Sequence, residues 1–313
     1  MKVIISFFIF FSFLFSSGFT NAIELYKSKK YKEAFKLFYT LADNDNADAQ
    51  YNLALMYLKG IGTAKNEILA FVWFDISARN GNKLAQNKLG TLYENGSILG
   101  QKDFEKAIKN YKQSAEQNYP IAQYNLAIHL DESNKEEKLQ QALYWYEKAS
   151  QAGNVAATNN LANMYFSGIG TQKDLKKAFE LYTKASNMND PIGKYNLSMM
   201  YYQGDYVKQN NDKALEFLLE AAILGNPVAQ VRLGKFYLKG NNLVTQDYKK
   251  ALTWFYEAAK QEYPPGLHQM GVCYFYGYGV PMDKKKAAFW FYQASDRGNQ
   301  FSSKFIKKYN LTY

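Results

Sequence analysis

The sequence predicts an all-α protein, a right-handed α/α superhelical solenoid of about seven helical hairpins with a cap at each end. From Ala47 onward the chain repeats itself every 35 to 37 residues, a period typical of stacked helical hairpins. Within each repeat, small and large apolar residues recur at the spacing of one helix face. The seven repeats span 47–82, 83–119, 120–154, 155–190, 191–226, 227–263 and 264–299.

The first half of each repeat predicts a helix, named helix A. Its third and eighth residues are small, its seventh is Leu or Met, and its eleventh is Tyr in every repeat except the third, which has Leu130. These positions lie along one side of a helix with 3.6 residues per turn, so neighbouring helices can approach closely there. A Gly then marks the end of helix A in six repeats, at Gly60, Gly96, Gly168, Gly204, Gly240 and Gly277.

The second half of each repeat predicts helix B, which begins at a residue with a short acceptor side chain suited to an N-cap. These residues are Asn66, Asp103, Asp174, Asp247 and Asp283. An Ala, then a large side chain, then a small pair form the apolar face that packs on helix A. In the third repeat, the stretch from Asp131 to Lys138 replaces the Gly-containing loop, and we expect an irregularity or hinge there, with Glu136 and Glu137 in a solvated loop.

The two ends of the chain predict separate elements. Lys2 followed by a nearly unbroken apolar stretch indicates a signal peptide over 1–22, cleaved after Ala22, with an uncleaved membrane anchor as the alternative. After cleavage no membrane span is expected. Residues 23–46 form a partial repeat that caps the N-terminal end, and 300–313 form a C-terminal capping helix with Phe301, Phe305 and Ile306 turned inward.

The repeat resembles the SEL-one-like repeat family, which is related to the tetratricopeptide repeats but has a longer loop within each hairpin. The last repeat matches best, through 270–280, Asp283, Ala287, Trp290 and 297–299. The resemblance covers 47–299, and it implies a scaffold for protein–protein interactions in envelope assembly, signalling or host interaction. The signal peptide adds the expectation of a periplasmic or secreted location.

Composition argues against several other classes of function. The formal charge of +10 comes almost entirely from Lys, and the three Arg residues are far apart in sequence, so no nucleic-acid partner is expected. Cys273 is the only cysteine, and His129 and His268 are the only histidines. Cys273 and His268 point to different faces of one helix, and no metal-ligand cluster is visible. We therefore expect no catalytic residue, metal or cofactor, and we expect a protein that is not an enzyme.

A stripe on helix A is the candidate binding site. Helix A positions that face away from helix B should form the inner wall, by analogy with related superhelices, and here they carry few charges. They form either an aromatic and amide-lined groove for a protein or peptide partner, or packing buried by the neighbouring helices. The candidate residues are Tyr51, Asn52, Tyr124, Asn125, Asn160, Tyr195, Asn196, Met199, Tyr202, His268 and Phe275.

Two other functions stay open. Exposed Tyr and Trp also stack on sugars, which allows a cell-wall glycan binder. The second is an envelope enzyme that acts on cell-wall fragments or β-lactams, as has been associated with cysteine-rich relatives of this family. Those relatives bridge their helices with disulfides, and a chain with a single cysteine departs from them.

Overall fold

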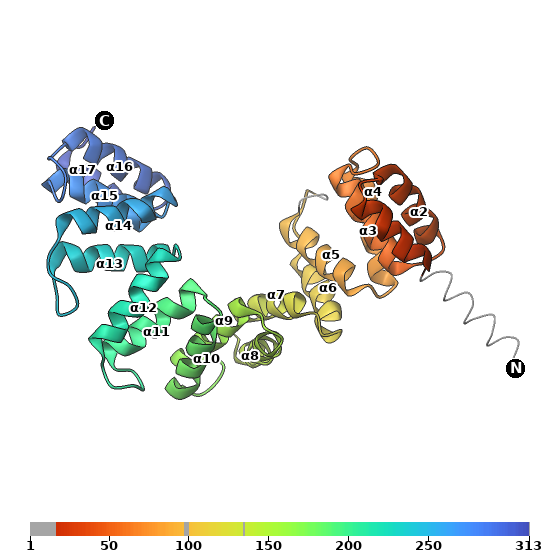
Figure 1. Cartoon of the computed structure of the whole chain (residues 1–313), viewed down its shortest axis with the longest axis horizontal. Coiled ribbons are helices and arrows are strands. Elements are labelled where there is room, and N and C mark those ends of the chain that lie inside the picture. The colour runs from red at the N-terminus through yellow and green to blue at the C-terminus, as the bar shows by residue number, and fades with distance from the viewer. Residues whose placement is uncertain (1–16, 97–99, 134, 313) are drawn as a thin grey trace, which may run out of the picture. The chain divides into compact units, whose positions relative to one another are not determined.

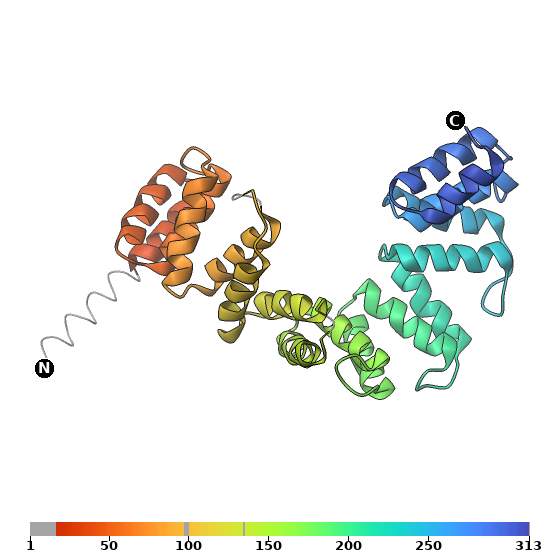
Figure 2. The ribbon, with the colours of Figure 1, turned by 180° about the vertical axis from the view of Figure 1, so that it is seen from behind.

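The computed structural model describes residues 17–96, 100–133 and 135–312, and every regular element in that part is a helix. The chain divides into two compact units, unit 1 (Met1–Asn154) and unit 2 (Val155–Tyr313), each built of antiparallel helical hairpins (Figures 1 and 2). The prediction of an all-α solenoid of seven hairpins is confirmed.

Unit 1 holds the first three repeats, and unit 2 holds the other four. Unit 1 contains the helical residues 17–27, then α2 (Tyr31–Asp43), α3 (Ala47–Lys59), α4 (Glu67–Arg79), α5 (Lys83–Asn95), α6 (Phe104–Glu116), α7 (Pro120–Asp131) and α8 (Glu136–Gln151). Unit 2 contains α9 (Val155–Ser167), α10 (Leu175–Asn187), α11 (Pro191–Gln203), α12 (Asn211–Ile223), α13 (Pro227–Lys239), α14 (Tyr248–Lys260), α15 (Pro264–Tyr276), α16 (Lys284–Asp296) and α17 (Gln300–Tyr309). The odd-numbered helices from α3 to α15 are helices A, and the even-numbered ones from α4 to α16 are helices B.

The small residues of helix A sit where other helices press closest. A Cβ atom placed on Gly90, Gly234 or Gly271, at the eighth position, would lie 2.5 to 2.7 Å from an aromatic ring of helix B in the same repeat. At the third position, a Cβ on Gly193 or Gly266 would lie 2.6 or 2.7 Å from an alanine Cβ in the preceding helix B. The two small positions therefore serve different contacts, one within the hairpin and one between hairpins.

A buried glutamine at the fourth position of helix A joins successive hairpins. The Nε2 atoms of Gln50, Gln86, Gln123 and Gln230 donate to a carbonyl eight residues earlier, at the end of the preceding helix, over 3.0 to 3.3 Å. In three of these residues, Oε1 accepts from the amide that follows helix B of the same repeat, at 2.8 to 3.0 Å. We call this arrangement the glutamine bridge.

The loop between helices A and B is closed by one backbone hydrogen bond. In six repeats the N-cap residue of helix B donates its N–H to the carbonyl of the Tyr at the eleventh position, over 2.8 to 2.9 Å. The predicted N-cap side chains also accept from the backbone, as Asp103 does from the Lys106 N–H at 3.0 Å. Because both ends of the loop are fixed in this way, these six hairpins are closed locally.

Two details of the sequence prediction are wrong. Glu136 and Glu137 form the first turn of α8 instead of a loop, since two acids at a helix N-terminus favour the helix through its dipole. Phe301 was expected to face inward on α17, but its side chain is 74% exposed. Phe305 packs instead, with its ring centroid 4.4 Å from that of Phe291.

The N-terminal helical residues 17–27 pack against α2. Ala22 is fully buried, and the ring of Phe19 lies edge-on to that of Phe38 at 5.9 Å. Most of the predicted signal peptide, residues 1–16, lies outside the described residues. Across the described ranges, no helix combines the length and apolar character needed to cross a membrane.

Candidate functional site

The predicted stripe lies along the joint between successive helices A. The fifth, ninth and twelfth positions of one helix A face the sixth and tenth positions of the next. In unit 1 the Nδ2 of Asn125 donates to the Oδ1 of Asn87 at 3.0 Å. In unit 2 the Nε of Arg232 donates to the hydroxyl of Tyr195 at 3.1 Å, and the rings of Tyr202 and Phe236 lie 5.6 Å apart. A side chain at this joint has a helix on one side and solvent on the other.

All eleven candidate residues are accordingly half-buried. Unit 1 contains Tyr51, Asn52, Tyr124 and Asn125, and unit 2 contains Asn160, Tyr195, Asn196, Met199, Tyr202, His268 and Phe275. Within unit 2, Tyr195, Asn196 and Met199 line one common pocket. That these residues bind a partner stays a prediction, and neither Tyr124 nor Tyr195 is buried enough to exclude it.

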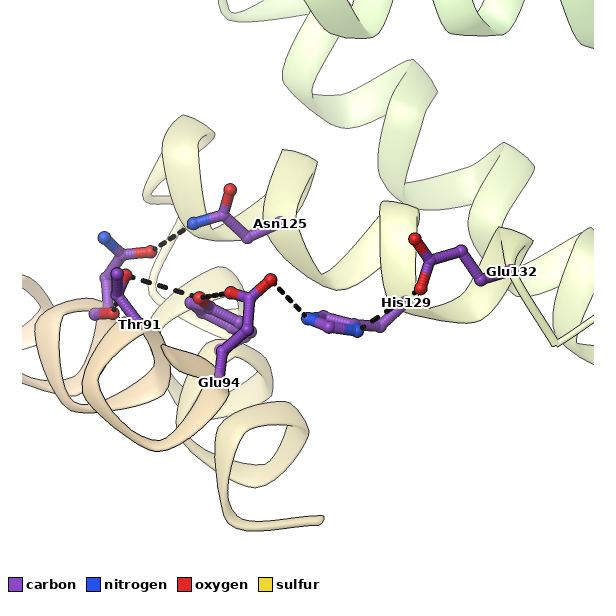
Figure 3. Close-up of polar contacts among 7 residues, drawn as sticks. Thr91, Glu94, Asn125, His129 and Glu132 are labelled. Carbon is purple, nitrogen blue, oxygen red and sulfur yellow. Dashed lines mark hydrogen bonds and ion pairs between the residues drawn. The ribbon is translucent and has the colours of Figure 1, made fainter. Parts of the chain in front are cut away.

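In unit 1 the joint between α5 and α7 carries a polar cluster (Figure 3). Glu94 accepts a hydrogen bond from the hydroxyl of Tyr111 at 2.6 Å, and one of its carboxylate oxygens lies 3.6 Å from Nε2 of His129. The other ring nitrogen of His129 lies 3.9 Å from Glu132, and the ring stacks on Tyr111 at 5.7 Å. We call Glu94, His129, Asp131 and Glu132 the acidic cluster.

Burial shapes the ionisation of groups around the acidic cluster. The pKa of the Tyr111 hydroxyl is raised, first by burial and then by its hydrogen bond to Glu94. The pKa of Asp131 is also raised by burial and by the neighbouring Glu132, while a hydrogen bond from Tyr146 opposes the shift. This joint therefore holds the carboxyl groups of Glu94 and Glu132 beside one imidazole, with Asp131 next to Glu132 on α7. No Lys or Arg among the described residues forms an ion pair with these carboxyl groups.

In unit 2 the corresponding joint is hollowed on both sides of Arg232. A pocket of about 250 Å³ lies between α9, α11 and α13, with Phe166, Met199 and Arg232 in its wall. A second pocket of about 330 Å³ lies between α13 and α15, and Arg232 shares its wall with Val228 and Phe236. We call the two pockets together the Arg232 groove.

The guanidinium of Arg232 is held by one tyrosine. Besides the hydrogen bond to the Tyr195 hydroxyl, its Cζ atom lies 5.8 Å from the centre of the Tyr195 ring. Lys235, on the same face of α13, lines the second pocket and is exposed. Neither pocket has an Asp or Glu in its wall, so the Arg232 groove is cationic.

His268 and Cys273 both lie on α15 but contact different residues. Burial, with a smaller contribution from Lys235, lowers the pKa of His268 to about 4, and its Nδ1 lies 2.8 Å from the hydroxyl of Ser302. Cys273 is fully buried in the core, and burial raises the pKa of its thiol to about 12. At neutral pH both side chains are uncharged, which favours structural roles for them. Among the described residues, no group of three metal-ligating side chains could hold an ion.

A larger pocket, of about 420 Å³, lies in unit 1 between α4, α5 and α6, away from the stripe. Two of the three cations in its wall already have partners, and the third, Lys109, is exposed. Arg79 pairs with Asp75 at 2.6 Å, and Lys106 pairs with Asp103 at 3.1 Å. The Arg232 groove is the stronger candidate site because its wall has no carboxylate, whereas Asp75 lies in the wall of this pocket. Neither Arg232 nor Lys235 has an ion-pair partner among the described residues.

Sequence analysis missed Arg232 and Phe236 as site residues. They occupy the sixth and tenth positions of helix A, whereas most residues of the predicted stripe occupy the fifth, ninth and twelfth positions. The signal was present, since Asn52, Asn125 and Asn196 were selected at the same sixth position that Arg232 holds in its repeat.

Comparison with known proteins identifies the repeat. The Sel1 repeat pattern matches 47–82, 83–119, 120–154, 155–190, 191–226, 227–263 and 264–299. A sel1-like repeat-containing protein of Acanthamoeba polyphaga mimivirus is 35% identical over 28% of this chain. An uncharacterized protein of Neisseria meningitidis serogroup B is 31% identical over 46% of this chain. The matches span only 15% and 29% of those two relatives.

Solved structures share the fold over nearly the whole chain. The crystal structure of a Sel1 repeat protein from Oxalobacter formigenes is 27% identical, has a TM-score of 0.75 and matches over 94% of this chain and 87% of that one. The uropathogenic Escherichia coli protective antigen c5321 is 23% identical, with a TM-score of 0.67, over 95% of this chain and 73% of its own, a likeness of fold alone. Because Sel1 repeats account for residues 47–299, the chain belongs to the Sel1 repeat family.

Proposed function

We propose that this Sel1 repeat protein is an exported, non-catalytic scaffold that holds a segment of a partner protein in the Arg232 groove. The observation that carries the proposal is a half-buried joint with apolar and amide side chains, hollowed into two pockets that share one cation. An extended segment gains affinity there from apolar contacts and from hydrogen bonds to its backbone.

The groove has the composition expected of a protein-binding surface. Phe166, Met199 and Phe236 supply apolar area, and Asn163, Asn196 and Gln203 supply side-chain amides beside it. Aromatic residues, Met and Arg are enriched in protein interfaces, where a few anchors provide most of the binding energy.

Substitution of the stripe tests the proposal. Tyr195→Ala and Tyr202→Ala in unit 2 should abolish capture of the native partner, while Tyr124→Ala reports whether the joint in unit 1 contributes. Capture is measured by crosslinking in the native compartment followed by mass spectrometry, with circular dichroism as the control for helicity. Unchanged capture by a folded double variant would contradict the groove.

A second experiment separates a protein partner from a glycan. Binding to purified cell wall that survives protease treatment of that wall would favour a sugar ligand. Loss of binding after protease treatment would support the scaffold function.

We propose that residues 1–22 direct export to the periplasm or to full secretion. Lys2 and the apolar stretch after it support this. Cleavage after Ala22 would remove Phe19 and Ala22 from the N-terminal core, which we expect to destabilise unit 1 by about 2 kcal/mol. Sequencing the N-terminus of protein from the native host tests export, and an intact Met1 in the membrane fraction would support an anchor instead.

A further inference from the structure

The guanidinium of Arg232 lies in the wall of both pockets with its orientation fixed. Tyr195 holds it through the Nε hydrogen bond and the ring contact. Arg232 forms no ion pair with any residue in the described ranges. A guanidinium offers five N–H donors in a planar fork, and only the Nε donor of Arg232 has an acceptor among the described residues.

Two side-chain amides in the wall of the first pocket also keep donors free. The Oδ1 of Asn163 accepts from the Tyr182 hydroxyl, which leaves its Nδ2 without a partner within the part of the chain that the structure describes. Asn196 makes no hydrogen bond to the described residues. Arg232, Asn163 and Asn196 line the same pocket, so unpaired donors converge where no carboxylate of this chain is present.

The walls beside Arg232 are apolar in both pockets. Phe166 and Met199 lie on one side, and Val228 and Phe236 lie on the other. In an extended peptide, alternate side chains point to the same face. A segment that places one side chain at Arg232 therefore places the residues two positions before and two positions after it at the two pockets.

We propose that the Arg232 groove binds an extended peptide segment with an Asp or Glu side chain at Arg232 and an apolar residue two positions to each side. The inference rests on the proposed function and names the chemistry of its partner. Lys235, exposed in the second pocket, adds a second positive charge that attracts an acidic segment and rejects a basic one.

Selection from a random peptide library tests the proposal without a known partner. The library, displayed on phage, is selected on the full chain, on Arg232→Met and on Tyr202→Ala. Arg232→Met keeps an unbranched apolar stem and removes the charge, and Arg79→Met is the matched control because its guanidinium is already paired with Asp75. Circular dichroism and thermal unfolding show that each variant is folded, and Arg232→Lys replaces Arg232→Met if the latter is not.

The expected result is enrichment of an acid flanked by apolar residues at the stated spacing. The enrichment should persist on Arg79→Met and disappear on Arg232→Met. A selected peptide, acetylated and amidated at its ends, should lose about ten- to a hundredfold in affinity when its acid is changed to the amide, as measured by fluorescence anisotropy. The same change should have little effect on binding to Arg232→Met.

Three results would overturn the inference, and they differ in what they leave standing. If the enriched peptides lacked an acid but their enrichment depended on Tyr202, the groove would still be a peptide site, and recognition of a carboxylate would be contradicted. If a peptide whose only carboxylate is its free C-terminus bound as tightly as the selected peptide, the groove would recognise a C-terminal carboxylate and not an acidic side chain. Enrichment that is unaffected by Tyr202→Ala, or no enrichment at all, would reject the proposed function together with the inference.

Discussion

The joints between helices A in the two units share a backbone arrangement and differ in chemistry. At the joint between α5 and α7, Glu94 and Glu132 lie on either side of His129. The joint of unit 2 that carries the two pockets has Arg232 and Lys235 beside aromatic rings. The glutamine bridge and the small third and eighth positions are nevertheless present in both units. The repeat therefore fixes how hairpins pack and leaves the joint positions free to carry a binding function.

Charge reversal at the joint of unit 2 should have the largest effect. Arg232→Glu replaces an attractive contact with a repulsive one, so we expect an acidic peptide selected on the wild type to lose more than about a hundredfold in affinity. Glu132→Gln in unit 1 should change that affinity little. Fluorescence anisotropy with the same peptide measures both, and equal losses would show that binding is not confined to unit 2.

Loss of the glutamine bridge should destabilise the two units equally. Gln86→Leu and Gln230→Leu each leave a buried carbonyl and a C-cap amide unsatisfied, so each should lower the free energy of unfolding by about 1 to 3 kcal/mol. Denaturant unfolding measures the loss, and the exposed Gln113→Leu is the matched control. A large difference between the two buried sites would show that the bridge is not a common framework.

Acid should weaken unit 2 through His268. Its pKa is lowered from 6.5 to about 4 in the folded chain, so the unfolded chain binds the proton more readily. The stability is present above pH 6.5 and is lost as the pH falls toward about 4, by about 2 kcal/mol after allowance for solvent screening. His268→Asn keeps a polar atom near Ser302 and should remove this part of the pH dependence in thermal unfolding. An unchanged pH profile would contradict it.

Asp131 in unit 1 should show a smaller effect of the opposite sign. Burial raises its pKa, so the folded chain holds the proton more tightly, and its destabilising contribution at neutral pH is relieved as the pH falls. Asp131→Asn should therefore stabilise the protein slightly near neutral pH, and the gain should shrink in acid. A variant that is less stable than the wild type at neutral pH would show that the hydrogen bond from Tyr146 outweighs burial.

The fold could be predicted from the sequence because its signals are local and repeated. The helix-ending glycines and the N-cap residues act over a few positions, and seven copies make the period plain. The site could be predicted only in part, because its contacts join different repeats. Tyr195 and Arg232 are 37 positions apart, and no pattern within one repeat shows that their side chains meet.

The exposure of the stripe residues could not be predicted from the sequence either. The stripe residues are half-buried because two helices A share them, and the helical period alone does not show how much of a side chain the neighbour covers. The error at Phe301 has the same origin. Among the described helices, α17 packs mainly against α16, and the side chain of Phe301 faces solvent.

The backbone hydrogen bond that closes the loop in six repeats affects how such proteins can gain or lose repeats. In six of the seven repeats the N-cap N–H reaches a tyrosine carbonyl within its own repeat, so the closing bond of such a hairpin does not depend on its neighbours. Duplication or deletion of a whole repeat then leaves every remaining loop intact and creates one new joint. Gene duplication can in this way add recognition surface one joint at a time, with each new surface free to diverge.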